Sequence, residues 1–423
     1  MKIAIIGLGY VGIPLAIAAV KGGVDVIGYD ISNKVMTFLN EKKSHLKHIA
    51  DEDVKNLVEN KLFTHTNDPK DLAYAEYVII CVPTPLKTGM VPDLSFIESA
   101  VQTICDNFVN GQTVILESST YPGTTDNLVA GIFSENNIVV YRDVFLAYSP
   151  EREDPGNKSF HTASIPKLVG SCDPTSLKKA TTMYEMFIDN IIPVESAGIA
   201  EAAKILENTF RAVNIALVNE LKVLFARLGI DIWKVVDAAS TKPFGFMPFH
   251  PGPGLGGHCI PIDPYYLSYL ARSTGGEAKF IELAGEINSA MPEYVVNQLL
   301  LGIALKLDLP ISKVSIKVVG ISYKKDIDDF RESPALEIIK KLSELGVMMK
   351  YFDPWTDKFE FESFIESKYG FKIESEAVKD GDIVLLVTDH SSLDYKDIFN
   401  KSTMIVDTRN AFADFASDKI IKA

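Results

Sequence analysis

Cysteine and long apolar segments are both scarce in this sequence of 423 residues. Its four cysteines, at positions 81, 105, 172 and 259, are widely spaced and form no Cys-x-x-Cys pair. We therefore expect neither a disulfide framework nor a metal site, and a reducing, cytoplasmic compartment. After the first 20 residues, no segment reaches the ~18 uninterrupted apolar residues that a membrane-spanning helix needs.

Positive charge is also in short supply. Lys and Arg total 42 against 56 Asp and Glu, which gives a net charge of −14. This balance opposes attraction to nucleic acid or an anionic membrane, although a local basic pocket for a small anionic ligand remains open. The 47% hydrophobic and 23% charged composition is that of a globular chain, and its length predicts two or three domains.

The first 20 residues contain the one long uncharged run, Ile3–Val20. A secretion signal is one interpretation of such a run. Its glycines favour another, because Gly7-Leu8-Gly9-Tyr10-Val11-Gly12 lies between a predicted strand (3–6) and a predicted helix, and Asp30 ends the next strand (24–30). In that context the first glycine makes a tight turn, the second admits a pyrophosphate, the third allows close helix packing, and the acid binds the ribose hydroxyls. We expect NAD rather than NADP, because Asp30 would repel a 2′-phosphate.

The rest of the chain repeats this alternation of strands and helices. Apolar strands are predicted at 77–82, 113–117 and 144–149, so a parallel doubly wound sheet fills about the first 190 residues. One long helix follows over 198–228, where no Pro or Gly occurs after position 198. A second set of strands is predicted at 315–321, 347–353, 382–388 and 404–407, with a helix at 334–345.

The long helix is too long for one domain to cover, so we expect it to join two domains and to support a homo-oligomer, at least a dimer. The fold class is therefore α/β. We divide it into residues 1–195, a central helical part 196–305, and residues 306–423. The second strand-to-helix turn carries Gly320, Lys324 and Lys325 but lacks the second and third glycines, so it offers lysines rather than a backbone cradle.

Three further groups of residues indicate chemistry. The glycine-rich run Gly252–Asp263 contains Cys259, a candidate nucleophile or a buried small hydrophobe; a metal bound by His250, His258 and Cys259 is not supported by any other ligand cluster. Lys204 and Asn208 are four residues apart and share one face of the long helix. Glu151-Arg152-Glu153-Asp154 follows a strand at the carboxyl edge of the sheet, where ligands bind, unless it is a solvated loop.

Together these motifs resemble the UDP-glucose/GDP-mannose dehydrogenase family, and within it the UDP-N-acetylhexosamine 6-dehydrogenase branch. The resemblance covers essentially the whole chain. It is carried by Gly7–Gly12, Glu117–Gly123, Ser149–Glu153, Lys204 with Asn208, Gly256–Cys259, Lys324–Asp326 and Arg331–Pro334. It implies two Rossmann-like domains joined by a long dimerising helix, with NAD in the first domain and a UDP-sugar as the small-molecule partner.

The resemblance also implies a four-electron oxidation of the sugar C6 alcohol to a uronic acid, using two NAD per acid. Cys259 would form a thiohemiacetal and then a thioester, Lys204 and Asn208 would hold the reacting oxygen, and Glu151, Thr120 and Asp263 would complete the proton network. The implied cofactor contacts are Gly7, Gly9, Tyr10, Val11, Gly12, Asp30, Thr84, Thr120 and Arg331. The implied substrate contacts are Glu151, Arg152, Lys204, Asn208, Gly256, Lys324 and Arg409.

UDP-N-acetylglucosamine is our first expectation for the substrate, because the string Ser149–Asn157 resembles the N-acetylhexosamine branch. UDP-N-acetylmannosamine and UDP-glucose are alternatives. Two other classes of protein would share this build: a two-electron hydroxyacid or polyol dehydrogenase, which needs no cysteine, and a non-catalytic regulator that binds NAD or a nucleotide sugar. Cys259 separates the first class from the family reaction, and Cys259, Lys204, Asn208 and Glu151 together argue against the second.

Overall fold

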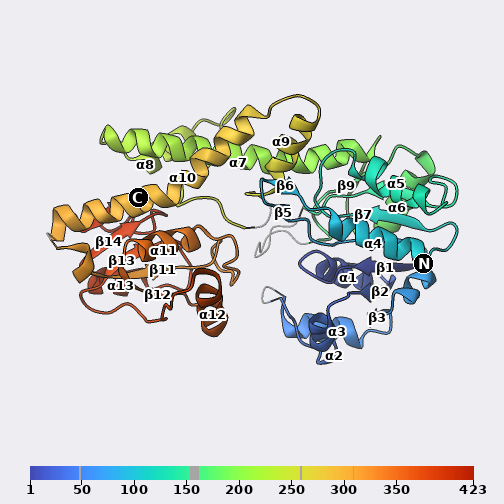
Figure 1. Cartoon of the computed structure of the whole chain (residues 1–423), viewed down its shortest axis with the longest axis horizontal. Helices are drawn as coiled ribbons and strands as arrows, with labels where there is room; N and C mark the ends of the chain where they lie inside the picture. Colours follow the sequence, from blue (N-terminus) through green and yellow to red (C-terminus); the bar gives the residue numbers. More distant parts are fainter. Residues whose placement is uncertain (47–48, 153–161, 258–259, 308) are drawn as a thin grey trace. The chain divides into compact units, whose positions relative to one another are not determined.

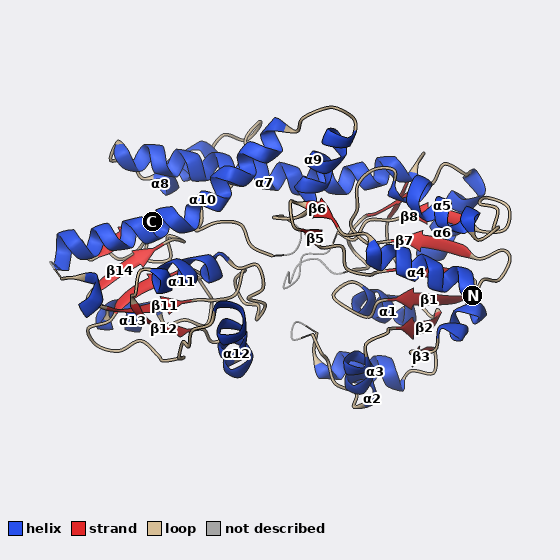
Figure 2. Ribbon diagram, viewed as in Figure 1, coloured by secondary structure: helices blue, strands red, loops and turns tan. Residues whose placement is uncertain are grey.

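The computed structural model describes the chain except for residues 47–48, 153–161, 258–259 and 308 (Figure 1). Its described residues divide into two compact units. The first unit comprises Met1–Asn208 and Ile262–Glu277, and the second comprises Thr209–Pro261 and Ala278–Ala423. Each unit is built on its own sheet, and helices flank the strands of both sheets (Figure 2).

The sheet of the first unit has the strand order β10-β9-β8-β7-β4-β1-β2-β3. These strands are β1 (Lys2–Ile6), β2 (Asp25–Tyr29), β3 (Phe63–Thr66), β4 (Tyr77–Ile80), β7 (Thr113–Leu116), β8 (Phe145–Tyr148), β9 (Lys167–Gly170) and β10 (Ile191–Val194). The predicted parallel sheet is confirmed, with one antiparallel junction between β8 and β9. At that junction two hydroxyls bridge the strands: Ser149 Oγ donates to the Leu168 carbonyl at 2.8 Å and Ser171 Oγ to the Leu146 carbonyl at 2.6 Å.

Two apolar clusters cover the two faces of this sheet, as a doubly wound fold requires. The helices of the first unit are α1 (Gly12–Lys21), α2 (Asn33–Asn40), α3 (Asp51–Glu59), α4 (Ser95–Asp106), α5 (Ala130–Glu135), α6 (Pro174–Tyr184) and α9 (Asp263–Ser273), and a small hairpin pairs β5 (Leu86–Lys87) with β6 (Val91–Pro92). Side chains of α1, α2, α3 and α6 enter one cluster, and those of α4 and α5 enter the other. The ligand-binding edge of the sheet is therefore left to the loops at its strand ends.

The long helix α7 spans Ala197–Arg227, so the predicted helix is confirmed to within one residue at each end. Ser196 Oγ accepts a hydrogen bond from the amide of Ile199 near its start. Gly229, which adopts a φ of +69°, follows its last turn and closes it with an amide-to-Ala226 bond. The division between the units falls within this helix, after Asn208.

The sheet of the second unit is wholly parallel, in the order β12-β11-β13-β14-β15. Its strands are β11 (Ser315–Val319), β12 (Met348–Phe352), β13 (Ile383–Leu386), β14 (Met404–Asp407) and β15 (Ile420–Lys422), and its helices are α8 (Ile232–Ser240), α10 (Lys279–Gly302), α11 (Pro334–Glu344), α12 (Lys358–Tyr369) and α13 (Tyr395–Lys401). Helices α10, α11 and α12 pack on one face, and α13 packs on the other. The repeated alternation seen in the sequence is thus a second doubly wound sheet.

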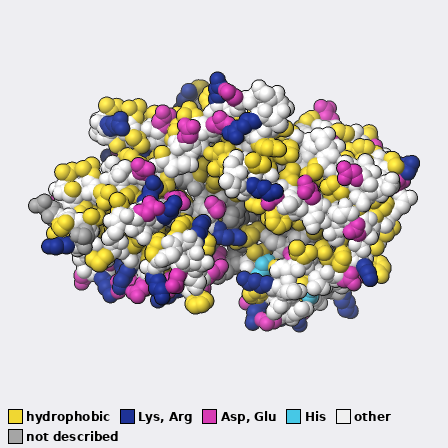
Figure 3. All heavy atoms as spheres, viewed as in Figure 1, with side chains coloured by type: hydrophobic (Ala, Val, Ile, Leu, Met, Phe, Trp, Pro, Cys, Tyr) yellow, Lys and Arg dark blue, Asp and Glu magenta, His cyan; other side chains and the backbone are white. Residues whose placement is uncertain are grey.

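Charged side chains of both signs are intermingled over the face shown in Figure 3. Within the described ranges, no helix has both the length and the apolar character needed to cross a membrane. The same residues contain no group of three or more His, Cys, Asp or Glu side chains placed to hold a metal ion.

Candidate functional site

The turn between β1 and α1 has the geometry of a nucleotide cradle. Gly7 has a φ of +92°, and a Cβ there would lie 2.6 Å from the carbonyl oxygen of Cys81. A Cβ on Gly12 would lie 1.9 Å from the Gly7 carbonyl oxygen, whereas one on Gly9 would meet nothing within 4 Å. Gly7 and Gly12 are therefore required by the fold, and Gly9 leaves one side of the turn open for a ligand.

Asp30 anchors this turn from the end of β2. Its Oδ2 accepts the amide of Leu8 at 2.8 Å, and its Oδ1 accepts the amide of Ser32 at 2.8 Å. Each carboxylate oxygen has a second lone pair, so the group can still accept a hydrogen bond from a ribose hydroxyl. These residues fit the adenosine half of NAD, with the amides at the start of α1 facing its pyrophosphate.

A lysine and a glutamate from distant segments meet beside the carboxyl edge of the first sheet. Lys204, on α7, is 5% exposed. Its Nζ donates a hydrogen bond to the backbone carbonyl of Glu151 and lies 3.4 Å from the Glu151 carboxylate oxygen Oε2. Glu151 directly follows Pro150 after β8, so the sheet edge and α7 together fix this pair.

One helical turn beyond Lys204, Asn208 holds a buried carboxyl group. Its Nδ2 donates to Oδ2 of Asp263 at 2.6 Å, and Asp263 is the first residue of α9. Burial, reinforced by the charge of Glu151, raises the pKa of Asp263 to about 6, although Lys204 and Asn208 oppose the shift. The cluster therefore offers an ammonium, two carboxyl groups and an amide, one of them with a pKa close to the working range of an enzyme.

The other expected residues of the first unit are held nearby in different ways. Thr120 is fully buried, and its Oγ1 lies 2.5 Å from that of Thr124. The backbone carbonyl of Thr84 accepts a hydrogen bond from the hydroxyl of Tyr266 on α9. Arg152 forms an ion pair with Glu207, at 2.6 Å between Nη2 and Oε1. Arg152 is thus positioned by α7 one turn after Lys204.

A pocket connects the glycine turn with this cluster. Its lining residues are Val11, Leu15, Glu117, Pro150, Glu151, Arg152, Thr162, Ile165, Pro166 and Lys167. The structure therefore brings the cofactor turn, through Val11, to the same cavity as Glu151 and Arg152.

The pocket also contains an ion pair to which the sequence analysis gave no role. Lys167 Nζ lies 3.0 Å from Oε2 of Glu117, and both side chains are buried. Tyr184 donates its hydroxyl hydrogen to the same carboxylate. The sequence signal was available: Lys167 is a single charge in an otherwise apolar strand, and a charge in such a place needs a buried partner.

Tyr148, the last residue of β8, was also missed. Its ring is fully buried, and its hydroxyl has no hydrogen-bond partner among the described residues. Burial, strengthened by the nearby charges of Glu201 and Asp263, raises the pKa of this phenol well above its usual range. Tyr148 therefore remains a neutral donor directed at an acidic region, which the apolar strand pattern could not reveal.

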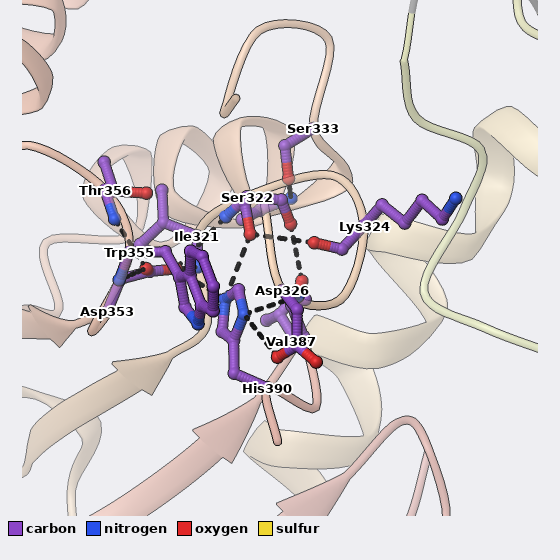
Figure 4. A network of polar contacts seen from close by, with 12 residues as sticks. Ile321, Ser322, Lys324, Asp326, Ser333, Asp353, Trp355, Thr356, Val387 and His390 are labelled. Atoms are coloured by element: carbon purple, nitrogen blue, oxygen red, sulfur yellow. Dashed lines mark hydrogen bonds and ion pairs between the residues drawn. The ribbon is translucent and has the colours of Figure 1, made fainter. Parts of the chain in front are cut away.

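The loop after β11 in the second unit carries Lys324, and a buried histidine holds it in place (Figure 4). The amide of Asp326 donates to Nδ1 of His390 at 3.0 Å, so the ring hydrogen is on Nε2. That nitrogen lies 3.1 Å from Oδ2 of Asp353 and 3.0 Å from Oγ of Ser322. Burial opposes ionisation of Asp353, at the end of β12, but the hydrogen bond from His390 and those from the amides of Ile321 and Thr356 outweigh it and lower the pKa of this carboxyl to about 2.

Three other expected ligand contacts belong to the second unit. Arg409 follows β14, and its Nε donates to the carbonyl of Val387 at 2.9 Å. Arg331 forms a two-pronged ion pair with Asp329, at 2.9 and 2.7 Å. A Cβ on Gly256 would lie 2.7 Å from the Cβ of Tyr323, so this glycine allows the close packing of two loops. His258 and Cys259, the expected nucleophile, lie outside the described residues.

A Rossmann-type cofactor turn beside a buried lysine and carboxyl cluster defines an NAD-dependent oxidoreductase. The chain belongs to the UDP-glucose/GDP-mannose dehydrogenase family, whose NAD binding domain matches residues 1–188, central domain residues 199–290 and UDP binding domain residues 317–414. The resemblance inferred from the motifs is thereby confirmed, and NAD is the cofactor.

Similar proteins span nearly the same length. A UDP-N-acetyl-D-glucosamine 6-dehydrogenase from Pseudomonas aeruginosa is 35% identical over 84% of this chain and 83% of its own. A UDP-N-acetyl-D-mannosamine dehydrogenase from Methanocaldococcus jannaschii is 33% identical over 97% of this chain and 92% of its own. The solved structure of a UDP-D-ManNAc dehydrogenase from Pyrococcus horikoshii has a TM-score of 0.87 at 31% identity, and the match covers 97% of this chain and 96% of that one.

Proposed function

We propose that this dehydrogenase oxidises the C6 alcohol of UDP-N-acetylglucosamine to the uronic acid, in two successive two-electron steps. The observation that carries the proposal is the convergence of Lys204, Glu151, Asn208 and Asp263 beside the pocket that also contains Val11 of the cofactor turn. Relatives named for UDP-N-acetylhexosamine oxidation support the choice of sugar.

The residues of the glycine turn would hold NAD, which would supply the hydride acceptor for each of the two oxidations. In the first step, Lys204 would donate a hydrogen bond to the C6 oxygen and stabilise the charge that develops on it. Asn208 and Asp263 would complete the proton path, since an aspartate with a pKa of about 6 is largely ionised at pH 8 and can accept a proton.

The second step requires a tetrahedral carbon, which the thiolate of Cys259 would supply by adding to the aldehyde. The resulting thiohemiacetal would lose its hydride and become a thioester. Water then attacks the thioester, the thiolate leaves, and the acid is released. Glu151, held against Lys204, would orient or deprotonate that water, and Thr120 belongs to the same proton network.

The remaining expected contacts stay part of this proposal. Gly7, Gly9, Tyr10, Val11, Gly12, Asp30, Thr84, Thr120 and Arg331 would contact the cofactor. Glu151, Arg152, Lys204, Asn208, Gly256, Lys324 and Arg409 would contact the nucleotide sugar. The match of the UDP binding domain to residues 317–414 supports the assignment of Lys324 and Arg409.

UDP-N-acetylmannosamine is the second candidate substrate. Relatives from archaea and a structure from Pyrococcus horikoshii, all named for that sugar, are 31–33% identical to this chain. The two sugars differ only in the configuration at carbon 2, so few contacts separate them. UDP-glucose, which lacks the acetamido group, ranks third.

We also propose a homo-oligomer formed along α7, in the cytoplasm. Six large apolar side chains on or just after this helix are exposed: Ile199, Leu206, Phe210, Leu217, Leu224 and Leu228. Several recur seven residues apart, which is the spacing of a helix-pairing stripe. The described residues place Cys105 and Cys172 in no disulfide, which supports a reducing compartment. Light scattering of wild type and of Leu217→Glu tests the assembly, and a wild-type particle of one chain mass, 46.6 kDa, would contradict it.

The division into residues 1–195, 196–305 and 306–423 is kept as a proposal for the domains. The ranges of the three family domains support it, since they leave residues 189–198 and 291–316 as connections.

The deciding experiment incubates the protein with NAD and each of the three UDP-sugars, and measures NADH per sugar consumed together with the product mass. We expect about two NADH per sugar for the preferred substrate, the stoichiometry of alcohol to acid. Cys259→Ala should bind both ligands yet form no acid. A ratio of one NADH per sugar, or full acid formation by Cys259→Ala, would contradict the covalent mechanism. If no UDP-sugar gave NADH, the protein would be a non-catalytic binder of NAD or a nucleotide sugar.

A further inference from the structure

A buried lysine of the second unit has no role in the chemistry above. Lys222, on α7, is 3% exposed, and its Nζ forms no hydrogen bond with any described residue. The ring of Tyr294 on α10 faces it, with its centroid 5.9 Å from Nζ. An ammonium group buried without a partner costs several kcal/mol, so Lys222 calls for an anionic ligand that the described residues do not supply.

The surroundings of Lys222 identify where that ligand would bind. Asn219, one turn earlier on the same face of α7, accepts the amide of Gly252 at 2.9 Å and donates to Asn288 on α10 at 2.9 Å. A Cβ on Gly252 would lie 2.7 Å from Nη1 of Arg409. The backbone of Gly252 therefore packs directly against a guanidinium, and α7 holds that backbone in place.

The charges facing Lys222 are those of Arg409 and Asp407, together with the phenol of Tyr294 on α10. The two carboxylate oxygens of Asp407 accept the amides of Arg409 and Phe412, each at 2.9 Å, and its charge favours the charged form of Lys222 without outweighing burial and Arg409. Burial first, and then the charge of Arg409, lower the pKa of Lys222 to about 7. An anion placed between the two cations would reverse that shift.

We propose that Lys222 and Arg409 form a two-cation subsite for the phosphate groups of the nucleotide sugar, in which Lys222 gains a proton as the anion binds. This inference rests on the proposed function, since Arg409 is assigned there to the substrate. Lys222 acts on the reaction through binding alone, as a positioning residue beside Arg409. The bound diphosphate keeps its two charges, and the proton comes from solvent.

The test is isothermal titration calorimetry of the full-length protein with UDP-N-acetylglucosamine at pH 8, in HEPES and in Tris. These buffers differ in ionisation enthalpy, so the difference in heat counts protons taken up. The diphosphate diester has no proton of its own to gain near this pH. With a pKa of about 7 before binding, wild type should take up as much as about 0.9 proton per site.

Lys222→Met removes the titrating group without leaving a cavity, and Lys234→Met, an exposed lysine on α8 of the same unit, is the matched control. We expect no proton uptake by Lys222→Met and wild-type uptake by Lys234→Met. Affinity should fall by up to about tenfold per pH unit above pH 7 in wild type, and stay flat in Lys222→Met. The melting temperature of Lys222→Met at pH 7 should equal or exceed that of wild type, because an unpaired buried charge is lost.

Two results would overturn the subsite while leaving the proposed function intact: binding of UDP-N-acetylglucosamine by wild type without proton uptake, or the same uptake by Lys222→Met. A lower melting temperature for Lys222→Met with unchanged pH dependence would show a structural role instead. Failure of wild type to bind any UDP-sugar would overturn the proposed function and the subsite together.

Discussion

The two doubly wound sheets differ at two equivalent positions. These are the acid after the second strand and the loop between the first strand and the next helix. In the first unit, Asp30 follows β2 and accepts the backbone amides of Leu8 and Ser32, and α1 begins at Gly12, six residues after β1. In the second unit, the acid that ends β12, Asp353, accepts the amides of Ile321 and Ser322 after β11 and also contacts His390. The next helix, α11, begins only at Pro334.

This difference shows how one architecture is adapted to two ligands. A short glycine turn exposes backbone amides and one side of a carboxylate, which suits a pyrophosphate and a ribose. A long loop hides its acid in an internal network and presents a lysine side chain instead. In Figure 4 the Lys324 side chain extends away from the buried network that holds its loop. The following variants test the comparison, from the largest expected loss of stability to none.

Gly12→Ala should be the most damaging change. A Cβ at this position would lie 1.9 Å from the Gly7 carbonyl oxygen and 3.2 Å from the side chain of Ile5, so both the turn and β1 must move. We expect a loss of at least about 3 kcal/mol of unfolding free energy, together with NAD binding. Gly131→Ala is the matched control, because its Cβ would meet nothing within 4 Å inside α5. Denaturant unfolding that showed the two variants to be equally stable would contradict the close contact.

Asp353→Ala should rank second, with a loss of about 3–5 kcal/mol at neutral pH, because it leaves buried amides and His390 without their acceptor. Its effect should depend on pH. The folded-state pKa of about 2 lies below the ordinary value of 3.8, so the stabilising effect is present above pH 4 and is lost as the pH falls toward 2.

The gap in stability between wild type and Asp353→Ala should therefore narrow over that pH interval. Asp357→Ala provides the control, because its carboxylate only caps α12 from an exposed position, at 2.8 Å from the amide of Glu360; it should cost about 1 kcal/mol. The preference for NAD over NADP should not change in Asp353→Ala. A change in that preference would mean that Asp353 also contributes to cofactor selection.

Asp30→Ala should cost less stability than Asp353→Ala, about 1–2 kcal/mol, because two part-buried backbone amides lose their acceptor. Its main effect should be on the cofactor. The KM for NAD should rise and discrimination against NADP should weaken, because both the ribose acceptor and the repulsion of a 2′-phosphate are removed. Initial rates with both cofactors measure this preference. Equal kcat/KM of the wild type for NAD and NADP would contradict the role of Asp30 in selecting NAD.

The sequence predicted the parts of this comparison that depend on local pattern. The glycine spacing, the acid at position 30 and the helix over 198–228 were all recognisable, because turn chemistry and apolar periodicity act within a few residues. The missing glycines after Gly320 also indicated that the second turn works differently. The ion pair of Lys167 with Glu117, and the contacts of His390 with Asp353, join residues 37 or more positions apart, and no periodicity encodes such a meeting.

Gly9→Ala should leave stability unchanged and still impair the enzyme. A Cβ at this position would have no protein atom within 4 Å. Alanine also restricts the unfolded chain slightly more than glycine does, so the free energy of unfolding should match that of wild type to within about 0.5 kcal/mol. NAD should nevertheless bind at least about tenfold more weakly, because the added methyl group occupies the side of the turn that the pyrophosphate approaches. Calorimetric titration with NAD beside a thermal melt separates these two effects. Wild-type affinity of Gly9→Ala for NAD would show that the pyrophosphate binds elsewhere. Weak NAD binding with a wild-type melting temperature would identify the open side of this turn as the cofactor-binding surface that distinguishes the first sheet from the second.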